Sequence, residues 1–285
     1  MRPLGMVLVG LSLWLSLTPA WSASPIDPAR EARVRQALLS SGLPVQLHFL
    51  PSHALHQFEV DPARVPAEHL ALIEKTVRHS FRPKPVLDGI VEALVTNYNE
   101  QALDDLIRWF QSPRGRKIVE AETLAASPEG MAALRTFPTQ TKAEATSRER
   151  IRLMIHLDRV TRASETRVEL SRSLLVSMIE AAQTVNPGVS KASSADVNAL
   201  FDQQNARIEG AIQTQTVRAN LFTYRDIETD DLRAYVAFLQ SPAATWFRET
   251  ANDAAEKRLA QAARQFATEL ASVLSNDPAL YASDE

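Results

Sequence analysis

The chain of 285 residues contains no cysteine. No disulfide can therefore form, even in an oxidising compartment, and no cysteine can carry the lipid of a lipoprotein. Stability must come from the burial of apolar side chains, and a chain of this length can build a sufficient core.

Glycine is scarce, with eight residues in the whole chain, and the six beyond the N-terminal segment never cluster. Loops that cradle phosphate need clustered glycine, because their backbone takes unusual angles close to the ligand. The sequence also lacks a nucleophile elbow, a P-loop and a dinucleotide fingerprint. We therefore expect no cofactor and assign no catalytic residue, although a catalytic triad needs no motif and enzymatic activity stays open.

The formal net charge is only −3, and no long run of one sign occurs. Nucleic acid as a main partner is thus disfavoured, because phosphate binding needs clustered Lys and Arg. Beyond the N-terminus the chain has no apolar run that approaches the length of a membrane span.

The first residues have the layout of a secretory signal peptide. Arg2 gives a basic start, residues 4–17 are almost wholly apolar, and Ala20-Trp21-Ser22 offers small residues at the −3 and −1 positions. We expect a signal peptide over residues 1–22, cleavage near Ser22, and a periplasmic or secreted mature protein. The alternative is an uncleaved anchor, for which the apolar run is short.

From Pro28 onward apolar residues recur mostly at helical spacing, and alanine with charged helix formers dominates. The predicted fold class is all-α, with two related helical halves in a bundle-like array: residues 28–145, residues 146–280 and a frayed tail at 281–285. A strand over residues 45–50 is discounted because it would have no partner. The predicted helices are 28–41, 66–81, 86–97, 100–111, 113–126, 128–136, pieces of 139–185, 194–222, 229–240 and 242–275.

Gln-Ser-Pro occurs twice, in WFQSPRG at residues 109–115 and in FLQSPAA at residues 238–244. At an offset of 129 residues, both copies are preceded by apolar residues spaced i, i+3, i+4, i+7, as on one helix face. The first set is Leu103, Leu106, Ile107 and Phe110, and the second is Leu232, Tyr235, Val236 and Leu239. A period this long indicates two copies of one helical module.

Each Ser-Pro predicts a corner between two helices. Proline disfavours helical angles at the residue before it, while serine caps the next helix and proline suits its first position. The residues assigned to this structural motif are Trp109, Phe110, Ser112, Pro113 and Gly115 in the first copy, and Phe238, Ser241 and Pro242 in the second.

With these residues in view, the chain resembles an exported bacterial family classed as a domain of unknown function. Its signature is an acidic helix start, an aromatic pair and x-Ser-Pro-x-Gly. The first copy matches at Asn99-Glu100, Trp109-Phe110 and Ser112-Pro113-Arg114-Gly115; the second matches at Asp230-Asp231, Phe238 and Ser241-Pro242 but has Leu239 and Ala244 where an aromatic and a glycine are expected. The resemblance implies a helical protein of a Gram-negative envelope and brings no catalytic residues with it.

Five of the six histidines lie between residues 48 and 79. A helix there would place His53 and His56 side by side as possible zinc ligands. The segment lacks the His-Glu-x-x-His arrangement of zinc proteases, and exposed or capping histidines are the commoner outcome. We assign no metal site and keep these two residues as the alternative.

Arg114, Arg116 and Lys117 follow the first corner, beside a helix N-terminus that could attract an anion or a partner. The second copy has small and aromatic residues there, so the corner itself does not require the cations. The acidic pairs Asp104-Asp105 and Asp230-Asp231 are more simply explained by the positive end of a helix than by acid–base catalysis.

These observations favour a non-catalytic binding or interaction protein of the cell envelope. Its partner would be another envelope protein or an apolar or anionic ligand, held between helices or between the two halves. One alternative is an envelope hydrolase or metal-dependent enzyme that uses the His-rich segment 48–79, and another is a structural helical spacer.

Overall fold

The computed structural model describes residues 27–57, 67–137, 148–185 and 193–275, and in these ranges the chain is helical without any strand. The predicted signal peptide and the predicted tail lie outside the described residues. The all-α prediction is confirmed. The helices are α1 (Pro28–Ser40), α2 (Leu43–His48), α3 (Leu50–Gln57), α4 (Ala67–Ser80), α5 (Pro83–Thr96), α6 (Glu100–Phe110), α7 (Pro113–Ala126), α8 (Pro128–Thr136), α9 (Arg148–Thr161), α10 (Ala163–Val185), α11 (Ser194–Thr223), α12 (Thr229–Leu239) and α13 (Pro242–Ser275).

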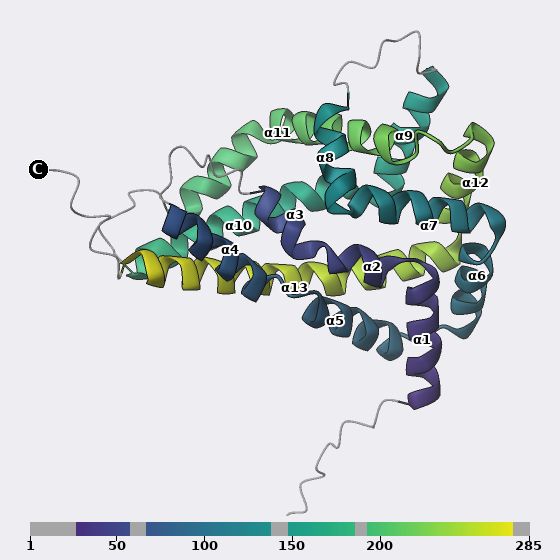
Figure 1. Ribbon diagram of the computed structural model, residues 1–285, viewed down its shortest axis with the longest axis horizontal. Helices are drawn as coiled ribbons and strands as arrows, with labels where there is room; N and C mark the ends of the chain where they lie inside the picture. Colours follow the sequence, from purple (N-terminus) through teal and green to yellow (C-terminus); the bar gives the residue numbers. More distant parts are fainter. Residues whose placement is uncertain (1–26, 58–66, 138–147, 186–192, 276–285) are drawn as a thin grey trace, which may run out of the picture.

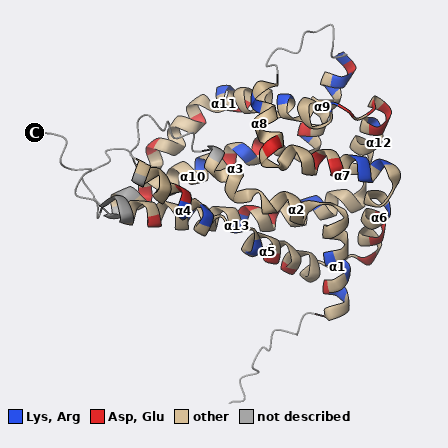
Figure 2. Ribbon diagram, viewed as in Figure 1, with Lys and Arg blue, Asp and Glu red and all other residues tan. Residues whose placement is uncertain are grey.

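The longest of the described helices, α13, extends across most of the molecule (Figure 1). It packs most extensively on α10 and α5, and it also contacts α4 and α6. Lys and Arg and Asp and Glu are both spread over the helices, among a majority of other residues (Figure 2). None of the described helices combines the length and apolarity that a membrane span requires.

The region before α4 differs in detail from the sequence expectation, because residues 43–57 form the short helices α2 and α3. Gly42 starts α2 with a φ of 73°, and a Cβ there would lie 2.6 Å from Cγ1 of Val119 in α7. Glycine thus provides both the left-handed angle and the close approach that lets α2 pack on α7.

Helix α5 begins three residues earlier than predicted. Pro83 occupies the first helical position and Pro85 the first turn, where no backbone N–H is needed for the helix. The predicted break is consequently confined to the residues just before Pro83.

A joint divides the long helical stretch of the second half into α9 and α10. Arg162 has a φ of 57°, which ends α9, and the buried Asp158 carboxylate accepts hydrogen bonds from the backbone N–H and hydroxyl of Ser164. This carboxylate satisfies N-terminal donors of α10 that would otherwise lack a partner.

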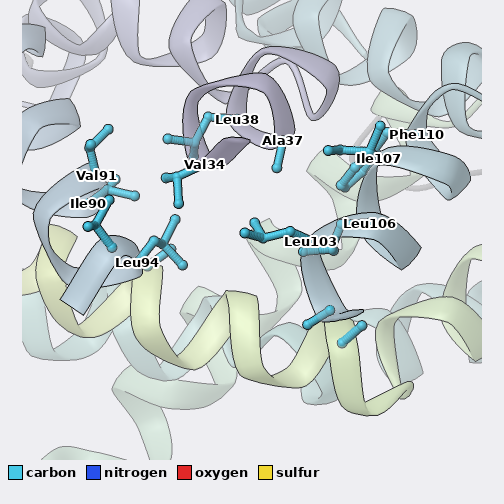
Figure 3. Close-up of a cluster of buried hydrophobic side chains, with 14 of the residues drawn as sticks. Val34, Ala37, Leu38, Ile90, Val91, Leu94, Leu103, Leu106, Ile107 and Phe110 are labelled. Atoms are coloured by element: carbon cyan, nitrogen blue, oxygen red, sulfur yellow. The ribbon is translucent and has the colours of Figure 1, made fainter. Parts of the chain in front are cut away.

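The first large apolar cluster joins the two halves of the chain. Val34 and Leu38 of α1 face Ile90 and Leu94 of α5 and Leu103 of α6 (Figure 3). Residues of α13 close the cluster, among them Ala243, Ala244 and Ala251. Helix α6 therefore buries its apolar face partly against a helix from the other half.

The buried residues of the second large apolar cluster come from the second half of the chain, with one exception from the first half. Ile118 of α7 packs among residues of α9, α11 and α12 and of the turn between α11 and α12. The members from the second half are Met154, Leu157, Leu221, Tyr224, Ile227, Leu232, Tyr235, Val236 and Leu239. Each corner's second helix thus packs against the helices of the other half.

Candidate functional site

The two Gln-Ser-Pro segments form closely similar corners. Helices α6 and α12 each have 11 residues, and α7 and α13 begin at Pro113 and Pro242. Ser112 Oγ accepts a hydrogen bond from the N–H of Gly115 at 3.0 Å, and Ser241 Oγ accepts one from Ala244 at 3.2 Å. In both corners the serine caps the helix that the proline begins.

The first corner is tighter than the second. A Cβ on Gly115 would lie 2.1 Å from the carbonyl oxygen of Trp109 and 2.7 Å from Cα of Phe110. Backbone atoms cannot give way as a flexible side chain can, so only glycine fits. Ala244 occupies the corresponding position of the second corner and is buried there with its methyl group.

The corners meet through their aromatic side chains. Trp109 stacks on Phe238 with ring centroids 4.1 Å apart and planes 8° from parallel, and it also stacks on Tyr235 at 5.3 Å. Phe110 meets Phe238 edge to face at 5.5 Å. Trp109 and Phe238 hold corresponding positions at the offset of 129, so each corner packs against its counterpart.

A groove of about 460 Å³ lies where the corners meet. We call it the corner groove; it is lined by Asp105, Arg108, Trp109, Ser112, Phe238, Ser241, Pro242 and Ala243. Its apolar lining comes from both corners, and an ion pair of 2.7 Å between Asp105 and Arg108 lies at its edge. The groove is open to solvent, and Trp109, Phe238, Pro242 and Ala243 are the residues that offer apolar contacts there.

Arg114 and Lys117, which were predicted to contact an anion, form ion pairs with a carboxylate of the same chain. Arg114 Nε lies 2.8 Å from one carboxylate oxygen of Asp231, and Lys117 Nζ lies 3.2 Å from the other. Asp231, in the first turn of α12, has a side chain only 11% exposed. Figure 2 shows Lys and Arg, in blue, at the start of α7.

The hydrogen bonds from Lys117 and Arg114 lower the pKa of Asp231 below its ordinary value. Both cations are therefore engaged in holding α7 to α12, while Arg116 is exposed. The side chains of Arg114 and Lys117 remain 59% exposed, so their outer faces are accessible to solvent.

The histidines are dispersed. The His53 Nε2 lies 2.8 Å from the carbonyl oxygen of Ala126 at the end of α7, so its N–H donates there. The side chain of His56 is outside the described part of the chain. His69 is buried, and His79 lies 3.5 Å from Glu269. Within the described ranges no three His, Asp or Glu side chains gather in a way that could hold a metal ion.

Sequence reasoning identified the corners but not the groove. The stack of Trp109 on Phe238 joins residues 129 positions apart, and only tertiary packing brings them together. The sequence signal that could have suggested this contact is the aromatic residue at corresponding positions of the two copies, but no contact between them was predicted.

Comparison with protein families gives a match over part of the chain. Residues 86–136 match the model of a bacterial family described as an uncharacterized protein conserved in bacteria (DUF2059). No curated protein and no solved structure matches the chain. The match extends from α5 through the first corner to the end of α8. Over this first corner, the chain is therefore similar to a bacterial family without a known function.

Proposed function

We propose that this protein is a non-catalytic binding protein of the bacterial cell envelope, exported by cleavage near Ser22, which holds an apolar ligand in the corner groove. The observation that carries the proposal is the groove itself, because it forms only where the two corners meet. The bacterial family match and the N-terminal pattern of residues 1–22 support the setting.

The corner groove is a better candidate than the cations of the first corner. Arg114 and Lys117 already neutralise Asp231, so an anion would compete with an internal carboxylate. At the groove, by contrast, the exposed edges of Trp109 and Phe238 offer aromatic surface to an apolar group. Arg116 and the outer faces of the two paired cations would then contribute at most a peripheral contact to an anionic end of the ligand.

Intrinsic fluorescence tests the proposal, since Trp109 and Trp246 are the tryptophans of the chain beyond the predicted signal peptide. In the variant Trp246→Phe of the chain from Ala23, Trp109 alone reports on the groove. Titration with fatty acids of increasing chain length should change its emission saturably, with the affinity rising with chain length.

Two substitutions localise the binding. Phe238→Ala removes half of the aromatic stack and should weaken binding at least tenfold. Leu124→Ala, which truncates an exposed leucine at the end of α7, should leave binding unchanged. A flat titration with every probe, or equal binding by both variants, would refute the groove as a ligand site and favour the structural spacer.

A further inference from the structure

Glu122 of α7 lies where four segments of the chain meet. Its Oε1 accepts hydrogen bonds from the hydroxyl groups of Tyr224 and Tyr235, both at 2.7 Å. Tyr224 caps the end of α11, and Tyr235 belongs to α12. Gln46 of α2 places its Nε2 3.4 Å from Oε2 of Glu122. One carboxyl group thus connects α7 to three other helices.

No cation balances this carboxyl group among the residues that the structure describes. Glu122 itself is half-buried, and its carboxyl group lies against the hydroxyl groups of Tyr224 and Tyr235, whose side chains are both buried. The nearby cations have other partners: Arg114 and Lys117 hold Asp231 of α12, and Arg150 of α9 donates to backbone carbonyls of the turn between α11 and α12. An enclosed carboxylate without a cation is costly, and taking up a proton removes that cost.

Burial accordingly raises the pKa of Glu122 above its ordinary value, even though the hydrogen bonds from the two tyrosines act in the opposite direction. Burial also raises the pKa of Tyr224 and of Tyr235 well above the usual range. Both tyrosines consequently keep their protons and remain hydrogen-bond donors. Of these three groups, Glu122 is therefore the one that titrates.

We propose that Glu122, Tyr224, Tyr235 and Gln46 form a proton-binding site that fastens α7 to α2, α11 and α12. With its proton on Oε2, Glu122 donates to the carboxamide oxygen of Gln46 after that group turns over, while Oε1 still accepts from both tyrosines. Loss of the proton leaves a negative charge among the packed helices and loosens their contact.

The proton site is linked to the first corner through an aromatic ring. Tyr235 donates to Glu122 and also stacks on Trp109, with ring centroids 5.3 Å apart. Release of the proton therefore alters the environment of Trp109, whether or not a ligand occupies the corner groove. The proposal is independent of the binding function above.

The direction of the pH effect follows from the raised pKa. A group whose pKa is higher in the folded state binds its proton more tightly there than in the unfolded state. The stability contributed by Glu122 is therefore present at low pH and is lost as pH rises through its folded pKa.

The test compares Glu122→Gln with Glu120→Gln in the full chain. The introduced amide keeps an acceptor for both tyrosines but cannot ionise, whereas Glu120 is an exposed residue on the same helix and serves as the charge-matched control. Between about pH 5 and pH 8, Tm of the wild type and of Glu120→Gln should fall more than Tm of Glu122→Gln. For every tenfold increase in the proton affinity of Glu122 on folding, which is about 1.4 kcal/mol, the difference in Tm should be about 3–5 °C.

Infrared difference spectra provide a second measurement, which reports the protonation state of the Glu122 carboxyl group. A protonated carboxyl band that titrates above the ordinary glutamic acid pKa of about 4.3 should be present in the wild type and in Glu120→Gln but absent in Glu122→Gln. If Glu122→Gln does not fold, Tyr235→Phe serves instead: it removes a donor to the ionised form, so the band should persist to higher pH. Full ionisation of Glu122 at about pH 5.5, or identical Tm profiles of both glutamine variants, would overturn the proposal.

Discussion

At the residue scale, the corner depends on the absence of a side chain at Gly115. The capping serine can be recognised in the sequence because its chemistry is local to one turn. The need for glycine is also local, since the obstructing atoms belong to Trp109 and Phe110 of the preceding helix. A tight corner of this kind requires Ser-Pro-x-Gly, whereas the second corner has room for the methyl group of Ala244.

Gly115→Ala should therefore destabilise the protein by about 1–3 kcal/mol, because the added methyl group forces two backbone segments apart. For a chain of this size that corresponds to a Tm lower by about 2–4 °C per kcal/mol, measured by thermal denaturation. Gly210→Ala is the control: nothing lies within 4 Å of a Cβ there, and the change should raise stability by up to about 1 kcal/mol. A neutral Gly115→Ala would show that the corner opens without strain.

At the element scale, helices were predictable where the apolar pattern was long and a capping residue or proline marked the helix start, as in α6, α7, α12 and α13. Helices α2 and α3 were not predicted, because six and eight residues that include Pro44 and Pro51 carry too little periodic signal. Contacts between helices were harder still: the acidic start of α12 was recognised as favourable to its own helix, while the attachment of Asp231 to α7 depends on packing.

Asp231→Asn should weaken that attachment and lower Tm near neutral pH. The pKa of Asp231 is depressed in the folded state, so its contribution is present above the unfolded pKa and is lost as pH falls through the folded value. The difference in Tm between Asp231→Asn and wild type should consequently shrink in acid.

Asp230→Asn provides the matched comparison, because Asp230 is an exposed neighbour that pairs with Arg233 of its own helix. Its substitution should change Tm little, as is usual for exposed ion pairs. Equal changes in Tm for Asp231→Asn and Asp230→Asn would mean that the ion pairs of Asp231 with Arg114 and Lys117 do not stabilise the protein more than an exposed ion pair does.

At the scale of the whole molecule, the two halves expected from the sequence are interlocked. The α6 face packs on α13 and Ile118 of α7 packs on α12, so neither large apolar cluster belongs to one half alone. Apolar periodicity cannot predict this packing between the halves, because it shows that a helix face is buried but not which helix covers it.

We therefore expect the halves to unfold in one cooperative transition. Calorimetry should give a single peak whose enthalpy matches the van't Hoff value, and helix content should be lost together with the fluorescence change of Trp109. Two separated transitions would show that each half retains its own stable core.

The stack of Trp109 on Phe238 has a genetic consequence. In a symmetric homodimer, one codon determines both sides of a contact across the two-fold axis, and every mutation is doubled. Here each side of the contact has its own codon. Tryptophan can therefore face phenylalanine, and Arg114 and Lys117 can follow one corner while Ala243 and Trp246 follow the other. Natural variation can thus change one wall of the groove at a time.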